Sequence, residues 1–171
     1  MTEEETKLHY ITPAILQNWN INNIRMEYKT PSKKSCDYAL FYNNKLLAIV
    51  EAKNINCSVD KGLEQAINYC YELKCPFAYS TNGKQFLEYN LFTQKTRILN
   101  MYEFPTPENI RYMANKTYNP IIFNQWNYGY SSIYQNHTTN FNHKRKYNIF
   151  LDIFMIIITG GLWLIWTLVR P

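Results

Sequence analysis

The 171-residue chain is long enough for one modest domain and an appendage, and its 15 Tyr and 9 Phe supply material for a core. Its formal net charge is +5, but the excess is uneven. Residues 1–110 hold 12 basic and 12 acidic residues, whereas residues 111–171 hold six basic residues and a single acidic one, Asp152. The neutral N-terminal part is therefore excluded as a general polyanion binder that acts through net charge, and any affinity for nucleic acid must come from local patches.

The cysteines indicate a reducing compartment. They form no CxxC pair and have no histidine partner at zinc spacing, which favours structural thiols over a zinc site. They are Cys36, Cys57, Cys70 and Cys75. The N-terminus, "MTEEETKLHY", is acidic and polar where a secretory signal needs a basic and then an apolar segment, so no signal peptide is expected.

The first segment, "TEEETKLHYITPAILQNW", predicts a helix. Thr2 is a suitable N-cap, and three glutamates follow in the first turn, where negative charge suits the helix dipole. Pro13 is expected to bend or divide this helix because it has no amide hydrogen.

Three strands are predicted next. A short strand, "NIRMEYKT", precedes two longer ones, "SCDYALFY" and "KLLAIVEAKN". The longer strands are joined by Asn43–Asn44, two residues that tolerate the left-handed turn of a hairpin.

A second helix and further strands follow. "DKGLEQAINYCYEL" is the clearest helix, because its apolar residues recur at helical spacing. These residues are Leu63, Ala66, Ile67, Cys70 and Leu73. "CPFAYSTNG" predicts a strand that ends in an Asn82–Gly83 turn, "KQFLEYNL" predicts the return strand, and "TRILNMYEFPTPENI" closes the unit with a candidate last strand and a proline-marked exit.

Residues 112–146 are polar and aromatic without a clear period, which is typical of a linker of partial order. Its tyrosines are suited either to stacking on nucleic-acid bases or to packing against the domain, and the composition favours packing.

The C-terminal segment predicts a single transmembrane helix at residues 147–170. The apolar run 149–169 would span roughly 31 Å at about 1.5 Å per residue. Trp163 and Trp166 lie toward its far end, and the basic cluster "HKRKY" precedes it, which favours a cytoplasmic N-terminal side. A buried core helix and an amphipathic helix lying on the membrane are the alternatives.

The hexapeptide "IVEAKN" places two charged residues, Glu51 and Lys53, at the end of an apolar run. Because side chains alternate along a strand, both point to the same side. An edge-strand surface pair, a buried ion pair and a pair held for chemistry are all compatible with the hexapeptide, which by itself favours the surface pair. Counting outward from the hairpin turn places Asp37 opposite residue 50 or 51, so Asp37 and Glu51 are expected to converge beside Lys53.

Such a cluster suits metal-assisted chemistry on phosphodiesters. Two carboxylates, Asp37 and Glu51, and a backbone carbonyl, that of Ala52, are ligands for a hard cation such as Mg²⁺, for which Mn²⁺ can substitute. The metal would lower the pKa of a bound water and stabilise charge on the phosphate. Lys53 would orient that water and offset the developing charge. The predicted reaction is hydrolysis of a phosphodiester bond.

At this point the sequence resembles a known family. Asp37 followed by Glu51-x-Lys53 resembles the PD-(D/E)xK nuclease signature, with Cys36 where a proline is usual. Residues 3–110 look like the N-terminal nuclease domain of the restriction (motor) subunit of type I restriction–modification enzymes. The blocks that carry this resemblance are "CDYALFYNNKLLAIVEAKN", "GLEQAINYCYELKCPFAYSTNGKQFLEYN" and "FPTPENI". The resemblance implies an α/β fold with a restriction-endonuclease-like αβββαβ core, in which helices flank a mixed central sheet.

The resemblance also implies roles for further residues. The family's Q-x-x-x-Y motif falls on Gln65 and Tyr69, whose spacing puts both on one helix face, within reach of the metal cluster or the DNA backbone. The family's Glu-Thr-Arg is matched within "EETK", so Glu5 is the candidate for an additional acidic residue, and Lys7 replaces the usual arginine. The predicted catalytic residues are Asp37, Glu51, Lys53, Gln65 and Tyr69.

The sequence departs from the family in its second part. It has no Walker motif, so no ATP site is expected, and the linker and anchor stand where the family has a motor. We expect a nuclease-like domain at 1–111, a linker at 112–146 and a membrane helix at 147–170.

The favoured function is a membrane-tethered, Mg²⁺-dependent DNA endonuclease on the cytoplasmic side of the cell membrane, acting in defence against foreign DNA. A protein partner that supplies DNA or specificity is also expected. One alternative is a nuclease-like module that binds DNA or protein without catalysis and recruits partners to the membrane. Another is a truncated restriction subunit with an incidental apolar tail.

Overall fold

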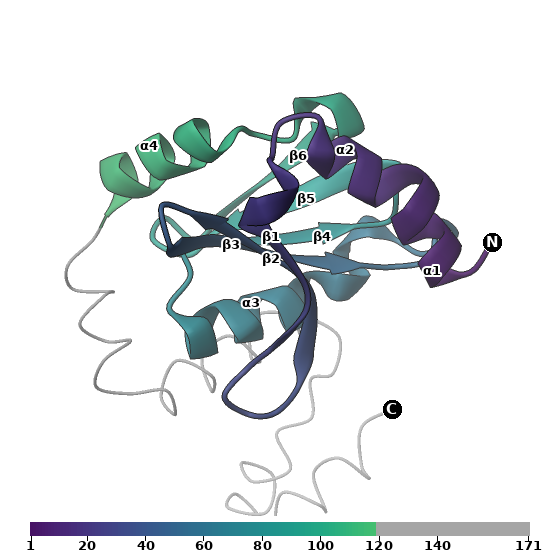
Figure 1. Ribbon diagram of the computed structural model, residues 1–171, viewed down its shortest axis with the longest axis horizontal. Coiled ribbons are helices and arrows are strands. Elements are labelled where there is room, and N and C mark those ends of the chain that lie inside the picture. The colour runs from purple at the N-terminus through teal and green to yellow at the C-terminus, as the bar shows by residue number, and fades with distance from the viewer. Residues whose placement is uncertain (119–171) are drawn as a thin grey trace, which may run out of the picture. The chain divides into compact units, whose positions relative to one another are not determined.

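The computed structural model describes residues 1–118; the predicted membrane helix and most of the predicted linker lie outside the described residues. Residues 1–118 form a six-stranded sheet in the order β1-β2-β3-β4-β5-β6 (Figure 1). Neighbouring strands are antiparallel except for β3 and β4, which are parallel. The strands are β1 Ile24–Lys29, β2 Ser35–Tyr42, β3 Lys45–Ala52, β4 Phe77–Thr81, β5 Gln85–Asn90 and β6 Lys95–Asn100.

The N-terminal helical segment has three consecutive parts, which are α1 Glu3–Thr6, a π-helical stretch Lys7–Ile11 and α2 Thr12–Leu16. Thr2 caps α1 as predicted, in a reciprocal capping box with Glu5. The π-helical stretch ends at Ile11, two residues before Pro13, and the Thr12 amide donates to the carbonyl of Lys7, five residues back. Pro13 itself lies inside α2, so the helical segment is not divided at this residue, and a bend there stays a prediction.

The β2–β3 hairpin has the predicted turn. Asn43 and Asn44 have φ angles of 49° and 60°, the left-handed values that a tight hairpin needs. The other strands predicted from the sequence are present as well, and Asn82–Gly83 follows β4, with Gly83 at φ 78°.

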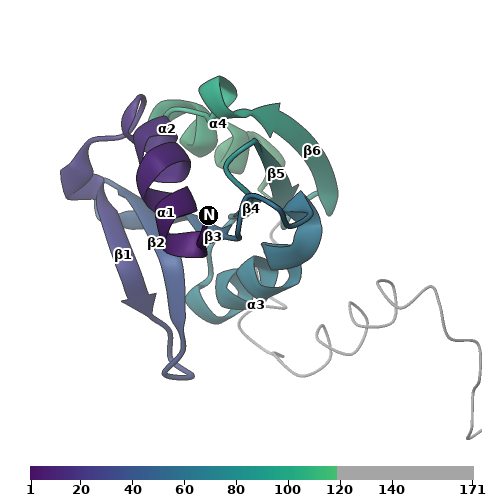
Figure 2. The same cartoon turned by 90° about the vertical axis from the view of Figure 1, so that its right-hand side faces the viewer.

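Helix α3, Leu63–Leu73, follows a 3₁₀ turn at Val59–Gly62 and connects the parallel strands β3 and β4. Figure 2 shows α3 on one face of the sheet and α1, α2 and α4 on the other. Strand alternation therefore sends neighbouring residues of β3 into two different environments.

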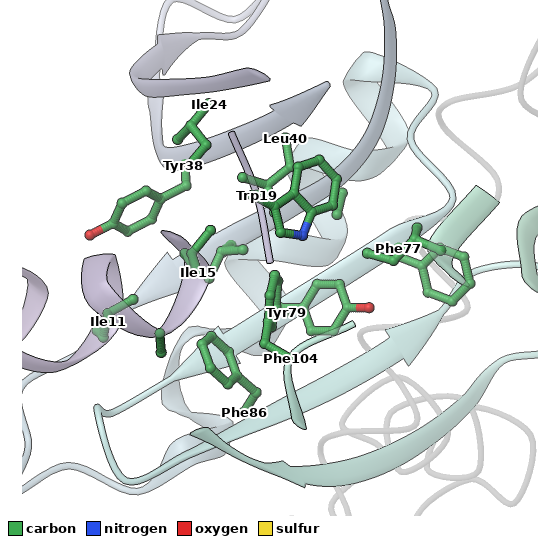
Figure 3. Close-up of a cluster of buried hydrophobic side chains, with 14 of the residues drawn as sticks. Ile11, Ile15, Trp19, Ile24, Tyr38, Leu40, Phe77, Tyr79, Phe86 and Phe104 are labelled. Atoms are coloured by element: carbon green, nitrogen blue, oxygen red, sulfur yellow. The ribbon is translucent and has the colours of Figure 1, made fainter. Parts of the chain in front are cut away.

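The face under α1, α2 and α4 holds an apolar core (Figure 3). Its largest fully buried members are aromatic or branched, and they include Tyr38, Phe77, Tyr79, Phe86, Phe104, Ile11 and Ile15. The polar atoms at its margin are bonded: Trp19 Nε1 donates to the Pro105 carbonyl at 2.9 Å, and the Tyr38 and Thr12 hydroxyls are 2.9 Å apart. This face of the sheet is filled by apolar core residues, including Val50 and Ala52 of β3. Glu51, which lies between them, therefore points to the other face, where α3 packs.

Helix α4, Pro107–Thr117, is an element that the sequence analysis missed. Thr106 caps it by accepting a hydrogen bond from the Asn109 amide at 3.2 Å, and Pro107 occupies the first turn, where proline is tolerated. Ile110 is fully buried in the core. The helix continues past residue 111, where the nuclease-like domain was predicted to end, and that boundary stays a prediction. No helix within residues 1–118 is both long and apolar enough to cross a bilayer.

Candidate active site at the end of the central strands

Asp37 and Glu51 meet where β2 and β3 stop pairing. The register pairs Tyr38 with Val50, so the next residues on the two strands are Asp37 and Glu51. The Asp37 amide donates to Glu51 Oε1 at 3.2 Å, and the Ala52 amide donates to Asp37 Oδ2 at 2.7 Å. At this point hydrogen bonds between side chains and backbone amides replace the backbone–backbone hydrogen bonds of the sheet. Asp37 and Glu51 therefore lie together, as the hairpin predicted.

The Glu51 carboxyl is buried without a full set of partners. The residue is 1% exposed, and its nearest cation, Lys53 Nζ, is 3.7 Å from Glu51 Oε2. Burial and then the nearby charge of Asp37 raise the pKa of Glu51 to about 8, although Lys53 opposes the shift. A divalent cation between the two carboxyls would remove this repulsion, so the donor set fits a hard metal ion.

Lys53 begins a chain of polar contacts that leads to α3. Its Nζ donates to Gln65 Oε1 at 3.3 Å, and Gln65 Nε2 donates to the Tyr69 hydroxyl at 3.0 Å. The motif residues Gln65 and Tyr69 therefore reach the cluster through Lys53. Tyr69 is only 5% exposed and lies on the buried side of α3. Its spacing from Gln65 in the sequence does not by itself indicate this burial.

Gly62 lets α3 approach the site closely. A Cβ atom at this position would lie 2.8 Å from Ser80 Oγ, 3.1 Å from Glu51 Cβ and 3.2 Å from Lys53 Cε. The Gly62 amide also donates to Ser80 Oγ at 3.1 Å. Only a residue without a side chain permits this contact, so Gly62 helps to place Gln65 beside Lys53.

Lys7 is a member of the site that sequence reasoning did not place there. Its Nζ is 2.6 Å from Asp37 Oδ1 and 3.0 Å from Glu4 Oε1, and the residue is 5% exposed. Burial lowers the pKa of Lys7, but the hydrogen bonds to Asp37 and Glu4 outweigh it and raise the pKa above its ordinary value. The only signal in the sequence was the match of "EETK" to a family motif.

Glu5 is engaged elsewhere. Its carboxylate accepts a hydrogen bond from the Thr2 amide at 2.6 Å, which lowers the pKa of Glu5, and it forms the capping box of α1. The glutamates that the structure links to Asp37 through Lys7 are Glu4, Glu27 and Glu3, of which Glu4 is the nearest to Lys7 Nζ. An additional acidic role for Glu5 stays a prediction.

The remaining donors near the cluster are weak candidates for chemistry. Cys36 is buried, and burial followed by the charge of Glu51 raises its pKa to about 12, so it remains a thiol. In the described part of the chain, no three His, Cys, Asp or Glu residues are grouped to hold a metal by themselves. A metal here would rest on two carboxylates together with backbone and water oxygens, a set typical of Mg²⁺.

Comparisons with known proteins define the class to which this domain is similar. Residues 5–75 match the family model of the second domain of the endonuclease subunit of the type I restriction enzyme EcoKI. The resemblance to the restriction subunit of type I enzymes, predicted from the sequence, is thereby confirmed.

Two particular relatives support this assignment. The EcoAI type I restriction enzyme endonuclease subunit of Escherichia coli is 32% identical over 104 residues, which cover 51% of this chain and 13% of that protein. A fragment structure described as the HsdR subunit of a type I restriction enzyme from Vibrio vulnificus YJ016 has a TM-score of 0.62 and 32% identity. That match covers 68% of this chain and 26% of the solved one. The chain thus spans a small part of the length of both relatives.

Proposed function

We propose that this chain is a Mg²⁺-dependent DNA endonuclease. The observation that supports it most is the buried Asp37–Glu51 pair beside Lys53, in which Glu51 lacks a full set of partners. The domain that holds the pair is similar to endonuclease subunits of type I restriction enzymes. The substrate and the reaction come from this similarity together with the chemistry of the donor set.

Asp37, Glu51 and the Ala52 carbonyl are the groups assigned to Mg²⁺. When bound, Mg²⁺ supplies electrostatic stabilisation of the phosphate and a more acidic water. The chain's own contribution is to keep two largely buried carboxyls together, where charge interactions are stronger than in solvent.

Lys53 is assigned to orient the attacking water and to offset charge on the phosphate. This role is supported by the position of its ammonium, which lies 3.7 Å from Glu51 Oε2 and 3.3 Å from Gln65 Oε1. Gln65 and Tyr69 are assigned to hold Lys53 in position and to contact the DNA backbone.

The test is plasmid cleavage by the full-length chain, purified in detergent, with Mg²⁺, Mn²⁺ or EDTA and with methylated and unmethylated DNA. Wild type should cut only with metal, and Asp37→Asn, Glu51→Gln and Lys53→Met should not cut. Glu108→Gln, which removes an exposed carboxylate on α4, is the matched control and should cut as wild type does.

Equal cleavage by wild type and all three site variants would overturn the assignment. If wild type binds DNA but does not cut it with any metal, the chain is instead a nuclease-like binding module.

We further propose that residues 147–170 tether the enzyme to the cell membrane, with the nuclease domain on the cytoplasmic side and a protein partner that supplies DNA or specificity. The support is the apolar run 149–169 and the preceding Lys144, Arg145 and Lys146, against a single Arg170 beyond it. Deletion of residues 147–171 should move the protein from the carbonate-washed membrane fraction to the soluble fraction. Recovery of the full-length chain in the soluble fraction would contradict the tether.

A further inference from the structure

Lys7 carries a positive charge into the centre of a ring of carboxylates. Its Nζ lies 2.6 Å from Asp37 Oδ1, and next come Glu4 Oε1 at 3.0 Å and Glu27 Oε1 at 3.5 Å. Glu3 completes the ring at 3.9 Å. The side chain of Lys7 is 6% exposed, whereas those of Glu4 and Glu27 are 79% and 64% exposed. The ammonium and Asp37 are therefore the buried pair, and the glutamates form its outer shell.

Two irregular pieces of backbone surround this ion pair. Lys7 is the first residue of the π-helical stretch, and Glu27, inside β1, has a left-handed φ of 48°. The β1–β2 register pairs Met26 with Tyr38 and Tyr28 with Cys36, so Glu27 lies across from Asp37. A left-handed residue within a strand is unfavourable for any residue but glycine, and here it accompanies the carboxylate that reaches Lys7.

The contacts divide the two oxygens of Asp37 between two donors. Oδ1 takes the Lys7 ammonium, and Oδ2 takes the Ala52 amide. A metal ion at Asp37 thus meets a carboxylate that is already fixed in orientation and already paired with a cation.

We propose that Lys7 is a positioning residue that competes with the metal: it holds Asp37 ready in the metal-free protein and thereby limits the affinity of the site for a divalent cation. The inference rests on the proposed metal site at Asp37 and Glu51. Two positive charges that share one buried carboxylate repel each other strongly, so the presence of Lys7 must weaken metal binding even as it organises the ligand.

Competition with the metal and a merely structural role predict opposite changes in metal affinity when Lys7 is removed. If Lys7 only held the fold together, its removal would loosen the site and weaken metal binding. If Lys7 competes with the metal, its removal lowers the stability of the metal-free protein but strengthens metal binding, because Asp37 is then a buried carboxylate with no cation of its own.

The experiment is calorimetric titration of Mn²⁺ into the full-length chain in detergent, together with thermal unfolding in EDTA. Lys7→Met should bind Mn²⁺ at least about tenfold more tightly than wild type, since one like charge is removed from Asp37, and should unfold at a lower temperature in EDTA. Lys7→Arg, which keeps the charge, should stay near the wild-type affinity. Lys45→Met, at the exposed far end of the hairpin, controls for net charge and should change neither value.

Unchanged or weaker Mn²⁺ binding by a folded Lys7→Met would overturn the inference while leaving the proposed metal site in place. Absence of Mn²⁺ binding by wild type and by every variant would overturn the proposed function itself. If Lys7→Met does not fold, the exposed Glu4→Gln decides, because it leaves Lys7 more firmly on Asp37. Weaker Mn²⁺ binding by Glu4→Gln supports the competition, and equal or tighter binding overturns it.

Discussion

Two buried glutamates on this sheet have opposite surroundings. Glu88 on β5 is 4% exposed and accepts hydrogen bonds from the Tyr79 hydroxyl at 2.6 Å and from Arg97 Nε and Nη2 at 2.6 Å and 3.0 Å. Glu51 on β3 is 1% exposed, but its described polar contacts are the Asp37 amide at 3.2 Å, the Asp37 carboxyl, which raises its pKa, and Lys53 at 3.7 Å. Burial alone therefore does not distinguish a glutamate of the candidate metal site from a structural glutamate. The difference is that Glu88 is fully paired and Glu51 is left with capacity for another cation.

The largest expected difference between the two glutamates is in catalysis. Glu51→Gln should lower Mg²⁺-dependent DNA cleavage by about 10³-fold, because the isosteric amide is neutral and cannot serve with Asp37 as the second anionic ligand of Mg²⁺. Glu88→Gln should cleave at the wild-type rate per folded molecule. Plasmid-nicking rates, corrected for the folded fraction by circular dichroism, measure this. Loss of cleavage in Glu88→Gln with full folding would remove the distinction.

For the free energy of unfolding, we expect substitution of Glu88 to cause a larger loss than substitution of Glu51. Glu88→Ala removes the partner of a buried hydroxyl and of an arginine at once, so it should lower the free energy of unfolding by about 3 kcal/mol. The side chain of Arg97 is 48% exposed and can turn to solvent, which keeps the cost from being larger. Urea unfolding in EDTA checks the value, with Glu108→Gln as the control. A change below about 0.5 kcal/mol, the range of ordinary surface substitutions, would show that the pairing is not stabilising.

The pKa of Glu51 predicts how stability depends on pH without metal. The folded-state pKa is raised to about 8 from the ordinary 4.5, so between these values the folded protein keeps a proton that the unfolded chain has lost. The stabilising contribution is therefore complete below about pH 4.5 and is lost as the pH rises through 8, at about 1.4 kcal/mol per pH unit and so by up to about 5 kcal/mol. Urea unfolding in EDTA from pH 5 to pH 8 should show this fall in wild type but not in Glu51→Gln. Parallel curves for the two proteins would mean that Glu51 is ionised throughout.

The smallest effects are expected on α3. Gln65→Ala should slow cleavage by about tenfold, since Lys53 loses the acceptor that orients it, and should leave stability nearly unchanged. Tyr69→Phe should slow cleavage by only a few-fold, because it removes the more distant hydroxyl of the same chain of contacts. Steady-state nicking and thermal unfolding together separate the two roles. A large loss of stability in Gln65→Ala would make this residue structural.

The sequence predicted local features well and long-range ones poorly. The Asn43–Asn44 turn pairs Tyr42 with Lys45, a register that by itself would put Asp37 opposite Val50. An irregularity between Leu40 and Phe41 shifts the pairing by one residue, so that Asp37 meets Glu51, and no local pattern in the sequence reports this shift. Lys7 was not predicted as a partner of Asp37, because its position depends on the packing of a π-helical stretch against β2, which no local pattern reports.

Two further features escaped the sequence for similar reasons. The Glu88–Arg97 pair depends on the register of β5 and β6, which aligns the two residues across the strands. Helix α4 is polar overall and buries Pro107 and Ile110, so few apolar residues mark it in the sequence, and its start is marked mainly by Thr106 and Pro107.

Mn²⁺ binding followed by electron paramagnetic resonance tests whether Glu51, rather than any buried carboxylate, is a metal ligand. The full-length chain, purified in detergent, is compared with Glu51→Gln and Glu88→Gln at equal folded concentration and pH 8. We expect wild type and Glu88→Gln to bind Mn²⁺ with the same affinity and Glu51→Gln to bind it at least about tenfold more weakly, because one of two anionic ligands is removed. Mn²⁺ binding by Glu51→Gln as tight as that of wild type would contradict this expectation.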